Sequence, residues 1–495
     1  MSKMKSLSKP LSSVAAVAIS LVLASCASPG VEPLEVTKGL VVRNVNIVNT
    51  RDGSTSSQMA VVIEGGSIRK IAPDRAIRTS GTVQTVDGSG KYLVPGFLDM
   101  HTHAMAAADQ PVTFWPLLIA NGVTGIREMA GSPEVIKRVS QLNADSAAGR
   151  VDAPAVLQVS GPLVAGIPAP AIAIAQVQQQ KAMGAGFVKI VAGSRDVILA
   201  VLAEAKAQGL GVAGHLSLGV TAIESSEAGW RAIEHLGAGM GILLDCATDA
   251  ANIRQAIVSG GGAQVPFSLA AVVSPLRFRA LDAPFYQRIM DTYNEAKCQE
   301  VSRVFVKNET WQVPTLIRVR TMAFSDDQGY RTDPNLAYID KGRRALWEGL
   351  AQQYSSSVPA PAATIFRQYY SLQEKLTKSM KQSGVKMLTG SDLGGIWVIP
   401  GFSLHQEFKA LAAAGLSPLE ILQMTTLNGA QFMNREASMG TVDEGKNADL
   451  VLLDANPVEA VANLDRIAAV VLKGKYFSKD ALDKMKSDVA SAYKN

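Results

Sequence analysis

Residues 94–103 read VPGFLDMHTH and carry the strongest structural signal in the chain. Apolar and β-branched residues dominate positions 92–100, so we expect a buried strand there. His101 and His103 follow as a His-x-His pair at its carboxyl end. Side chains two residues apart on a strand point the same way, so both imidazoles can reach one cation. The stretch therefore predicts a strand that delivers metal ligands to a loop face.

Short apolar segments alternate with helical patterns along the middle of the chain. Helical periodicity predicts amphipathic helices over residues 197–208 and 366–383. This alternation is typical of βαβ units, and eight of them predict an α/β fold built as a (β/α)8 TIM barrel. The eight predicted strands cover residues 92–100, 122–128, 155–161, 187–191, 211–215, 232–235, 311–316 and 386–391.

Both ends of the chain have a different sequence pattern, which predicts short strands joined by Gly-containing turns. We expect them to combine into one small β-sandwich domain, with the barrel inserted between them. The polar excursion over residues 322–365 has little strand character, and we expect it to form a lid or a subunit contact. The predicted units are a signal peptide (1–25), a tether (26–38), the β-sandwich (39–94 plus 435–480), the barrel (95–434) and a C-terminal tail (481–495).

Further metal-ligand candidates fall at the ends of other predicted strands. The chain has only 5 histidines. His215 and His235 end the fifth and sixth predicted strands, Asp392 follows the eighth, and Lys189 lies within the fourth. Because the carboxyl ends of barrel strands meet at one face, these side chains predict a common metal site.

Three other segments support a family resemblance. They read NGVTGIRE (121–128), GLSPLE (415–420) and GTVDEGKNADL (440–450). Together with residues 94–103, these segments make residues 40–475 resemble the amidohydrolase superfamily. Within it, the sequence is most similar to the imidazolonepropionase-like and prolidase-like branch. The resemblance implies a metal-dependent hydrolase.

Carried over to this sequence, the resemblance implies two divalent metal ions. His101, His103 and Asp392 would bind the more buried ion, and His215 and His235 the more exposed one. Imidazole and carboxylate ligands suit zinc, with manganese, cobalt or iron as substitutes.

The resemblance also gives Lys189 a role. A bare ammonium inside a barrel is costly. Reaction with CO2 would convert Lys189 into N6-carboxylysine, an anionic carbamate that bridges the two metals.

The implied reaction is hydrolysis of a C–N bond by a metal-bridged hydroxide, with Asp392 as the catalytic base. Dipeptides or N-acyl amino acids, rather than long peptides, are the expected substrates. Opening of lactones, esters or cyclic amides on the same site, and a non-enzymatic binding lipoprotein, are the alternatives. Nucleobase and guanine deaminases of this superfamily usually have a Glu shortly after the fifth-strand His, and no acid closely follows His215, so the resemblance implies hydrolysis rather than deamination. The candidates for substrate contacts, by position alone, are Ser217, Arg318, Arg320 and Tyr330.

Several residues have structural interpretations instead. We expect Asp99 to support the His pair from behind and His405, on a predicted helix, to be structural. Cys246 and Cys298 are isolated, and such residues are more often free and buried, although one disulfide is possible.

Composition and the N-terminus bound the class of protein. Of 495 residues, 47% are hydrophobic and 18% charged, which indicates a large core, and a net charge of +5 without basic clusters excludes nucleic-acid partners.

A basic start and the apolar run 11–24 lead into LASC (23–26), which resembles a bacterial lipobox with Cys26 as the lipidated residue. We expect an exported, membrane-anchored lipoprotein, on the outer membrane and facing the periplasm, that acts on a small molecule and that could form a homo-oligomer.

Overall fold

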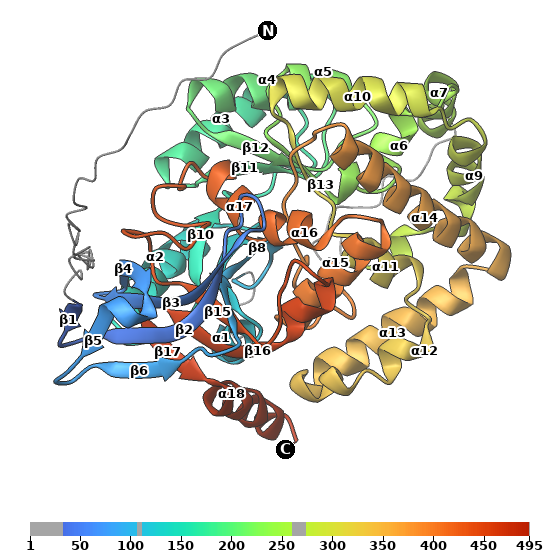
Figure 1. The fold of residues 1–495 in the computed structure, drawn as a ribbon. Coiled ribbons are helices and arrows are strands. Elements are labelled where there is room, and N and C mark those ends of the chain that lie inside the picture. The colour runs from blue at the N-terminus through green and yellow to red at the C-terminus, as the bar shows by residue number, and fades with distance from the viewer. Residues whose placement is uncertain (1–32, 106–110, 260–273, 495) are drawn as a thin grey trace, which may run out of the picture.

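The computed structural model describes residues 33–105, 111–259 and 274–494 (Figure 1). The predicted signal peptide and Cys26 lie outside these residues. No helix in the described ranges has the length and apolar character needed to cross a bilayer.

Strands from both ends of the chain form one mixed sheet, in the order β17-β16-β15-β7-β2-β3-β4, with β6 paired to β2 (Figure 1). The two ends meet where β15 runs antiparallel to β7, with Leu450 opposite Pro95. A separate two-stranded sheet joins β1 (Leu34–Val36), in the predicted tether, to β5 (Ile77–Thr79). The β-sandwich stays a prediction. The strands of the large sheet are β2 (Leu40–Val48), β3 (Thr55–Glu64), β4 (Ser67–Pro73), β6 (Gln84–Asp87), β7 (Tyr92–Pro95), β15 (Leu450–Leu453), β16 (Ile467–Leu472) and β17 (Lys475–Ser478).

Two parallel sheets occupy the middle of the chain, in the orders β10-β9-β8 and β11-β12-β13-β14. Parallel bridges from Ser160 to Phe187 and from Thr102 to Leu393 extend their edges. The result is a barrel-like α/β arrangement with all strand carboxyl ends on one side. Its strands are β8 (Phe97–Thr102), β9 (Val123–Glu128), β10 (Ala155–Val159), β11 (Phe187–Ile190), β12 (Gly211–Gly214), β13 (Ala232–Glu234) and β14 (Trp311–Val313).

Two predicted strands need correction. The strand predicted over 92–100 is divided between β7 and β8 at Gly96, where a side chain has no room because a Cβ would lie 2.1 Å from Thr124 Oγ1. The strand predicted over 386–391 is wrong. At one end of this segment, the backbone of Gln312 exchanges hydrogen bonds with the chain. At the other end, Met100 N donates to Thr389 O. The segment therefore passes from one neighbour to the other, and no continuous ladder forms with either.

Helices cover the parallel strands (Figure 1), and both predicted amphipathic helices are confirmed as α4 and α14. In α16, Ser417 and Glu420 of the 415–420 motif form a reciprocal capping box that satisfies backbone donors of the first turn. The helices are α1 (Pro111–Ala120), α2 (Pro133–Ala147), α3 (Pro170–Ala182), α4 (Arg195–Ala207), α5 (Ala222–Glu227), α6 (Gly241–Asp245), α7 (Ala250–Ser259), α9 (Ala283–Asp291), α10 (Glu295–Asn308), α11 (Leu316–Ala323), α12 (Gln328–Arg331), α13 (Lys341–Ser357), α14 (Ala360–Gln382), α15 (Phe402–Ala413), α16 (Pro418–Met424), α17 (Leu427–Phe432) and α18 (Lys479–Ala492).

The C-terminal residues predicted as a tail belong to α18. This helix buries Leu482 and Val489, which lie about two helical turns apart and therefore on one side of it, and it contacts α1.

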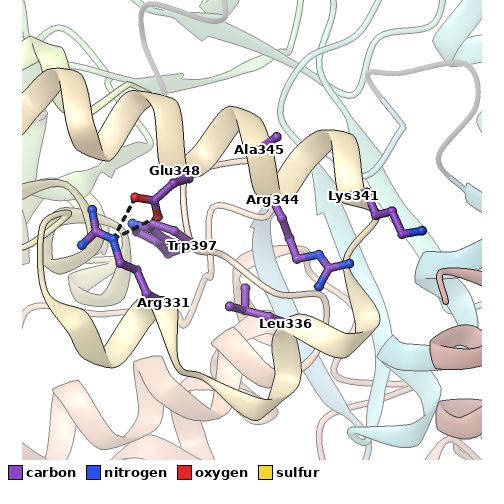
Figure 2. Close-up of a pocket in the computed structure, with 7 residues that line it drawn as sticks. All are labelled: Arg331, Leu336, Lys341, Arg344, Ala345, Glu348 and Trp397. Atoms are coloured by element: carbon purple, nitrogen blue, oxygen red, sulfur yellow. Dashed lines mark hydrogen bonds and ion pairs between the residues drawn. The ribbon is translucent and has the colours of Figure 1, made fainter.

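The excursion over residues 322–365 contains α12 and α13, which border a pocket of about 380 Å³ (Figure 2). Arg331 pairs there with Glu348, and Trp397 lies beneath them. Trp397 is buried and packs against Tyr330 and Trp347. None of the metal-ligand candidates lines this pocket. The prediction of a lid or subunit contact stays a prediction.

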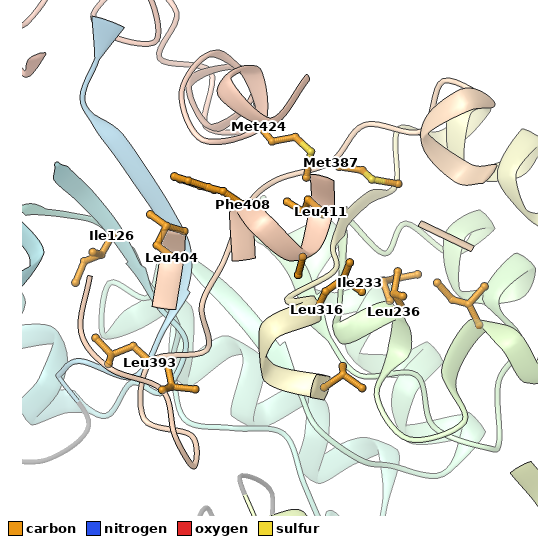
Figure 3. Packing of buried hydrophobic residues seen from close by; sticks show 14 of the residues in the cluster. Ile126, Ile233, Leu236, Leu316, Met387, Leu393, Leu404, Phe408, Leu411 and Met424 are labelled. Atoms are coloured by element: carbon orange, nitrogen blue, oxygen red, sulfur yellow. The ribbon is translucent and has the colours of Figure 1, made fainter. Parts of the chain in front are cut away.

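The core runs between the parallel strands and the helices that cover them. Figure 3 shows Leu404, Phe408 and Leu411 of α15 packed near Ile126 and Ile233 of the strands. The spacing i, i+4, i+7 places these three side chains on one face of the helix, and each is at most 1% exposed.

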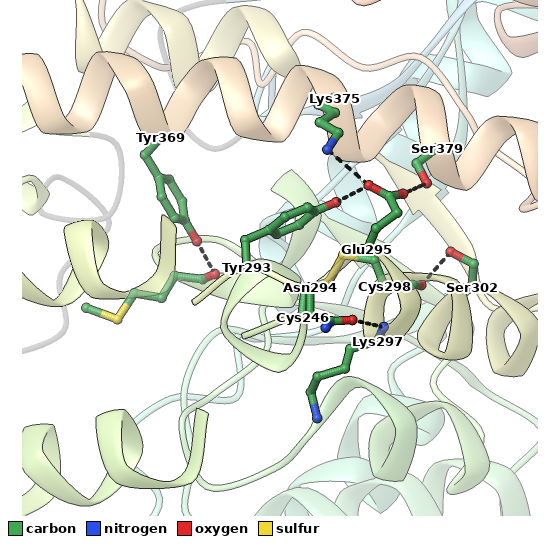
Figure 4. The surroundings of a disulfide bond; sticks show 11 residues. Cys246, Tyr293, Asn294, Glu295, Lys297, Cys298, Ser302, Tyr369, Lys375 and Ser379 are labelled. Carbon is green, nitrogen blue, oxygen red and sulfur yellow. Dashed lines mark hydrogen bonds and ion pairs between the residues drawn. A yellow bond between two sulfur atoms is a disulfide. The ribbon is translucent and has the colours of Figure 1, made fainter. Parts of the chain in front are cut away.

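Cys246 and Cys298 form a disulfide, with Cα atoms 4.8 Å apart, so the preference for free thiols is corrected (Figure 4). The sequence could not show that the end of α6 lies beside α10. Asn294 N donates to Cys246 O at 2.9 Å, which holds the two segments together. Both cysteines are fully buried.

Candidate metal centre

The predicted ligands lie at or near the carboxyl ends of β8, β11, β12 and β13 and in the segment that holds Asp392. His101 lies within β8, and His103 follows it by one residue. His215 directly follows β12, and His235 directly follows β13. Asp392 lies in the segment beside β8, where its N donates to His101 O at 2.9 Å.

Asp392 lies at the centre of this cluster. Its Oδ1 is 3.3 Å from Nε2 of His101 and 3.1 Å from Nε2 of His103. Its Oδ2 is 3.8 Å from Nε2 of His235. Ligand atoms of His101, His235 and Asp392 all lie within 4.8 Å of one another, as a single metal ion requires.

The other two candidates border this group. The ring of His215 lies 5.1 Å from that of His235 between centroids. Burial lowers the pKa of both imidazoles well below the usual value, so both are neutral and can donate a lone pair. Lys189 lies in β11, and burial lowers its pKa to about 8 against the opposing charges of Glu234 and Asp392.

The donor set fits a divalent cation because buried polar atoms are left without hydrogen bonds. His101 Nε2, His103 Nδ1, Asp392 Oδ1 and Lys189 Nζ have no hydrogen-bond partner among the described residues. Native proteins rarely leave such atoms unsatisfied. A cation bound by the imidazoles and the carboxylate would satisfy the lone pairs of His101 Nε2 and Asp392 Oδ1. Lys189 Nζ is a donor and needs an acceptor instead.

Glycines let the segments approach this closely. A Cβ at Gly390 would lie 2.7 Å from the Cβ of His101. The predicted supporting role of Asp99 has a geometric counterpart: its carboxylate accepts hydrogen bonds from Ser391 Oγ at 2.5 Å and Ser391 N at 2.9 Å. Asp99 therefore holds the residue next to Asp392.

Three contacting residues were not predicted. His235 Nδ1 lies at hydrogen-bond distance from Thr315 Oγ1, and His101 Nδ1 lies 2.7 Å from Glu234 Oε2. Arg127 pairs with the other oxygen of Glu234. The available signal was charge within mostly apolar strands, since β9 contains Arg127 and β13 ends in Glu234.

The candidates for substrate contacts occupy different places. Arg318 is buried, and its Nε donates to Asp392 Oδ2 at 2.7 Å. Arg320 donates to the Tyr330 hydroxyl at 2.7 Å, so these two engage each other beside α12. Ser217 Oγ accepts from Gly193 N at 3.1 Å. The structure thus brings only Arg318 of the four against Asp392.

His405 lies outside the cluster. Its Nε2 donates to Asn121 O at 2.9 Å, and its Nδ1 lies 2.6 Å from a carboxylate oxygen of Asp465. These contacts connect α15 to neighbouring segments, in keeping with the structural interpretation.

Glu407 provides a pH test of the packing behind the site. It is fully buried on α15, its Oε2 accepts from Ile317 N at 2.7 Å, and burial raises its pKa to about 8. The folded chain therefore holds a proton that the unfolded chain releases above its ordinary pKa, so the free energy of unfolding falls as pH rises from about 4.5 to 8.

Glu407→Gln keeps the acceptor for Ile317 N and removes the titration. We expect the variant to gain roughly 1–3 kcal/mol over wild type between pH 5 and pH 8.5. Urea unfolding of both proteins with a chelator present, at several pH values, measures this difference. Parallel stability curves for the two proteins would show that Glu407 is ionised in the folded state.

Comparisons with known proteins find similarity in sequence and in fold. Residues 372–476 match the sequence model of the Amidohydrolase family. That range includes Asp392 but none of the four clustered histidines. An adenine deaminase of Listeria welshimeri is 26% identical over 246 residues, covering 44% of this chain and 41% of the relative. The matched stretches span less than half the length of the curated relatives.

Solved structures show the same fold over most of the chain. A bottromycin amidohydrolase superposes with a TM-score of 0.67 at 19% identity, covering 92% of this chain and 90% of that one. A Xaa-Pro dipeptidase with bound methionine gives 0.59 at 17% identity, covering 89% and 100%. These neighbours support a TIM-barrel-like α/β fold, while the amidohydrolase family match is confined to residues 372–476.

Proposed function

We propose that this protein is a metal-dependent hydrolase that cleaves the C–N bond of small amide or peptide-like substrates on a (β/α)8 barrel. One observation carries the proposal. Imidazoles of His101, His103 and His235, from two strand ends, face the carboxylate of Asp392, and His101 Nε2 and Asp392 Oδ1 lack hydrogen bonds among the described residues. Such an arrangement needs a cation and is otherwise costly.

We propose two zinc ions, with His101, His103 and Asp392 holding one and His215 and His235 the other. Lys189, modified by CO2 to N6-carboxylysine, would bridge them. The lowered pKa of Lys189 supports this modification, because only the neutral amine attacks CO2. When bound, such metals supply Lewis acidity that activates water and polarises a carbonyl.

The chain's own residues then complete the reaction. Asp392 accepts the proton of the attacking water and returns it to the leaving nitrogen. Arg318, bonded to Asp392 Oδ2, restricts the carboxylate to one orientation. The buried surroundings of Asp392 strengthen these charge interactions.

Lys189→Ala tests the metal site. We expect the bound zinc to fall from about two equivalents per chain to about one or fewer, because the bridging anion is lost. Elemental analysis after dialysis measures the content. Lys181→Ala, which removes an exposed lysine, is the matched control. Two equivalents retained by Lys189→Ala would refute a bridging role, and none in wild type would refute the proposed function.

A hydrolysis panel identifies the substrate class. We expect dipeptides and N-acyl amino acids to be cleaved by the zinc-loaded protein, with lactones and esters as the second candidate class. Adenine belongs in the panel because of the deaminase relative, and we expect no ammonia from it, since no acid closely follows His215. Turnover of adenine alone would overturn the proposal.

We also propose export with a lipid anchor on Cys26. The buried Cys246–Cys298 disulfide supports an oxidising compartment. Cys26→Ser is expected to move the protein from the membrane to the soluble fraction. Unchanged membrane association of this variant would contradict lipidation.

A further inference from the structure

Glu234 is a buried carboxylate that contacts a candidate metal ligand from behind. It ends β13 and is fully buried. Its Oε2 lies 2.7 Å from Nδ1 of His101. The next residue, His235, also contacts His101, with ring centroids 4.4 Å apart. Consecutive residues Glu234 and His235 can both reach one ring because the backbone leaves β13 at His235, where φ is +54°.

This contact determines which nitrogen of His101 carries a proton. A carboxylate only accepts, so Nδ1 of His101 must donate to Glu234. In the neutral ring, Nε2 is then a bare lone pair that faces Asp392 Oδ1 at 3.3 Å. Two acceptors face each other there, and neither has a hydrogen bond among the described residues. A cation between them resolves the conflict.

Arg127 holds the carboxylate in place. Its guanidinium pairs with Glu234 Oε1, and its carbon lies 5.1 Å from the ring centroids of both Phe187 and Phe432. Cation–π contact and burial fix the guanidinium. The buried guanidinium thus faces the buried carboxylate and compensates its charge.

We propose that Glu234, clamped by Arg127, is a positioning residue that holds His101 as the Nδ1–H tautomer and so tightens divalent-cation binding at Nε2. The inference rests on the proposed function and goes beyond it by assigning a task to residues outside the ligand set. Outer partners of this kind strengthen metal binding by roughly 10–100-fold. We expect the effect at the ion held by His101, since the Glu234 side chain hydrogen-bonds to that ligand.

Glu234→Gln is the test, with Zn²⁺ as the probe. A glutamine has one carbonyl oxygen, so it cannot accept from both His101 and Arg127, and its amide nitrogen faces a donor. We expect one of the two zinc sites to weaken by roughly 10–100-fold and the other to be unchanged. Competition with a chromophoric chelator measures both affinities. Glu224→Gln removes a partly exposed partner of Arg195 and is the matched control, expected to bind as wild type does.

The outcomes separate the two proposals. If wild type binds no zinc, the proposed function fails. If wild type binds two zinc ions and Glu234→Gln binds both equally tightly, the positioning role is overturned and the proposed function stands.

A measurement on the wild-type protein covers the case in which Glu234→Gln does not fold. The chain has 5 histidines, so ¹⁵N-labelled histidine gives a small, assignable NMR spectrum. In the zinc-loaded full chain we expect the His101 signals of a protonated Nδ1 and a metal-bound Nε2. A metal-bound Nδ1, or a doubly protonated ring, would overturn the proposal.

Discussion

Asp392→Asn is expected to lower kcat/KM on any cleaved amide by about 10²–10⁴-fold. Asparagine has nearly the same shape, but it cannot accept a proton from water. It also leaves Arg318 without the carboxylate to which its Nε donates at 2.7 Å. Steady-state hydrolysis by variant and wild type at equal zinc content measures the loss.

Asp326→Asn is the matched control for Asp392→Asn. Asp326 also pairs with an arginine, Arg367, at 2.7 Å, but its side chain is 30% exposed and lies in the excursion over residues 322–365. We expect activity close to wild type from this control. Full activity in Asp392→Asn would show that another group takes the proton.

Removing the disulfide through the double substitution Cys246→Ala and Cys298→Ala is expected to lower the free energy of unfolding by about 2–4 kcal/mol. The bond closes a loop across 52 residues of sequence, which restricts the unfolded chain. Alanine avoids placing a polar group in this buried site. Urea unfolding of oxidised wild type and variant measures the difference.

Two controls accompany the double variant. Wild type treated with a reductant should approach the stability of the double variant. Thiol titration of denatured, unreduced wild type should leave Cys246 and Cys298 unlabelled. The hydrogen bond from Asn294 N to Cys246 O remains in every case, so the local contact persists without the covalent bond. A stability change below about 0.5 kcal/mol would show that the loop is already restricted in the unfolded state.

Local patterns predicted much of this molecule because they report on local physics. Alternating strand and helix periodicities gave the α/β class, and His-x-His at a strand end indicated a metal site. Capping residues such as Ser417 and Glu420 act within one helical turn, so their role can be read from four consecutive positions. The candidate histidines lie at strand ends, whose meeting at one face is a general property of parallel sheets. Asp392 instead follows a segment that forms no strand.

Features that depend on distant segments could not be predicted. The division of the first predicted strand depends on Thr124 lying against Gly96, and the failure of the eighth depends on two different neighbours. The substrate-contact candidates were chosen by position alone, and only the fold separated Arg318, at Asp392, from the Arg320–Tyr330 pair.

By itself, the sequence determined the residue types available for chemistry and the periodicities that make each strand and helix, because both are carried by neighbouring positions. Only the tertiary structure decided that Cys246 bonds to Cys298, that Glu234 contacts His101 and that Arg127 pairs with Glu234. Those pairings join residues tens to more than a hundred positions apart. Their energies arise from burial and close approach, which no local pattern encodes.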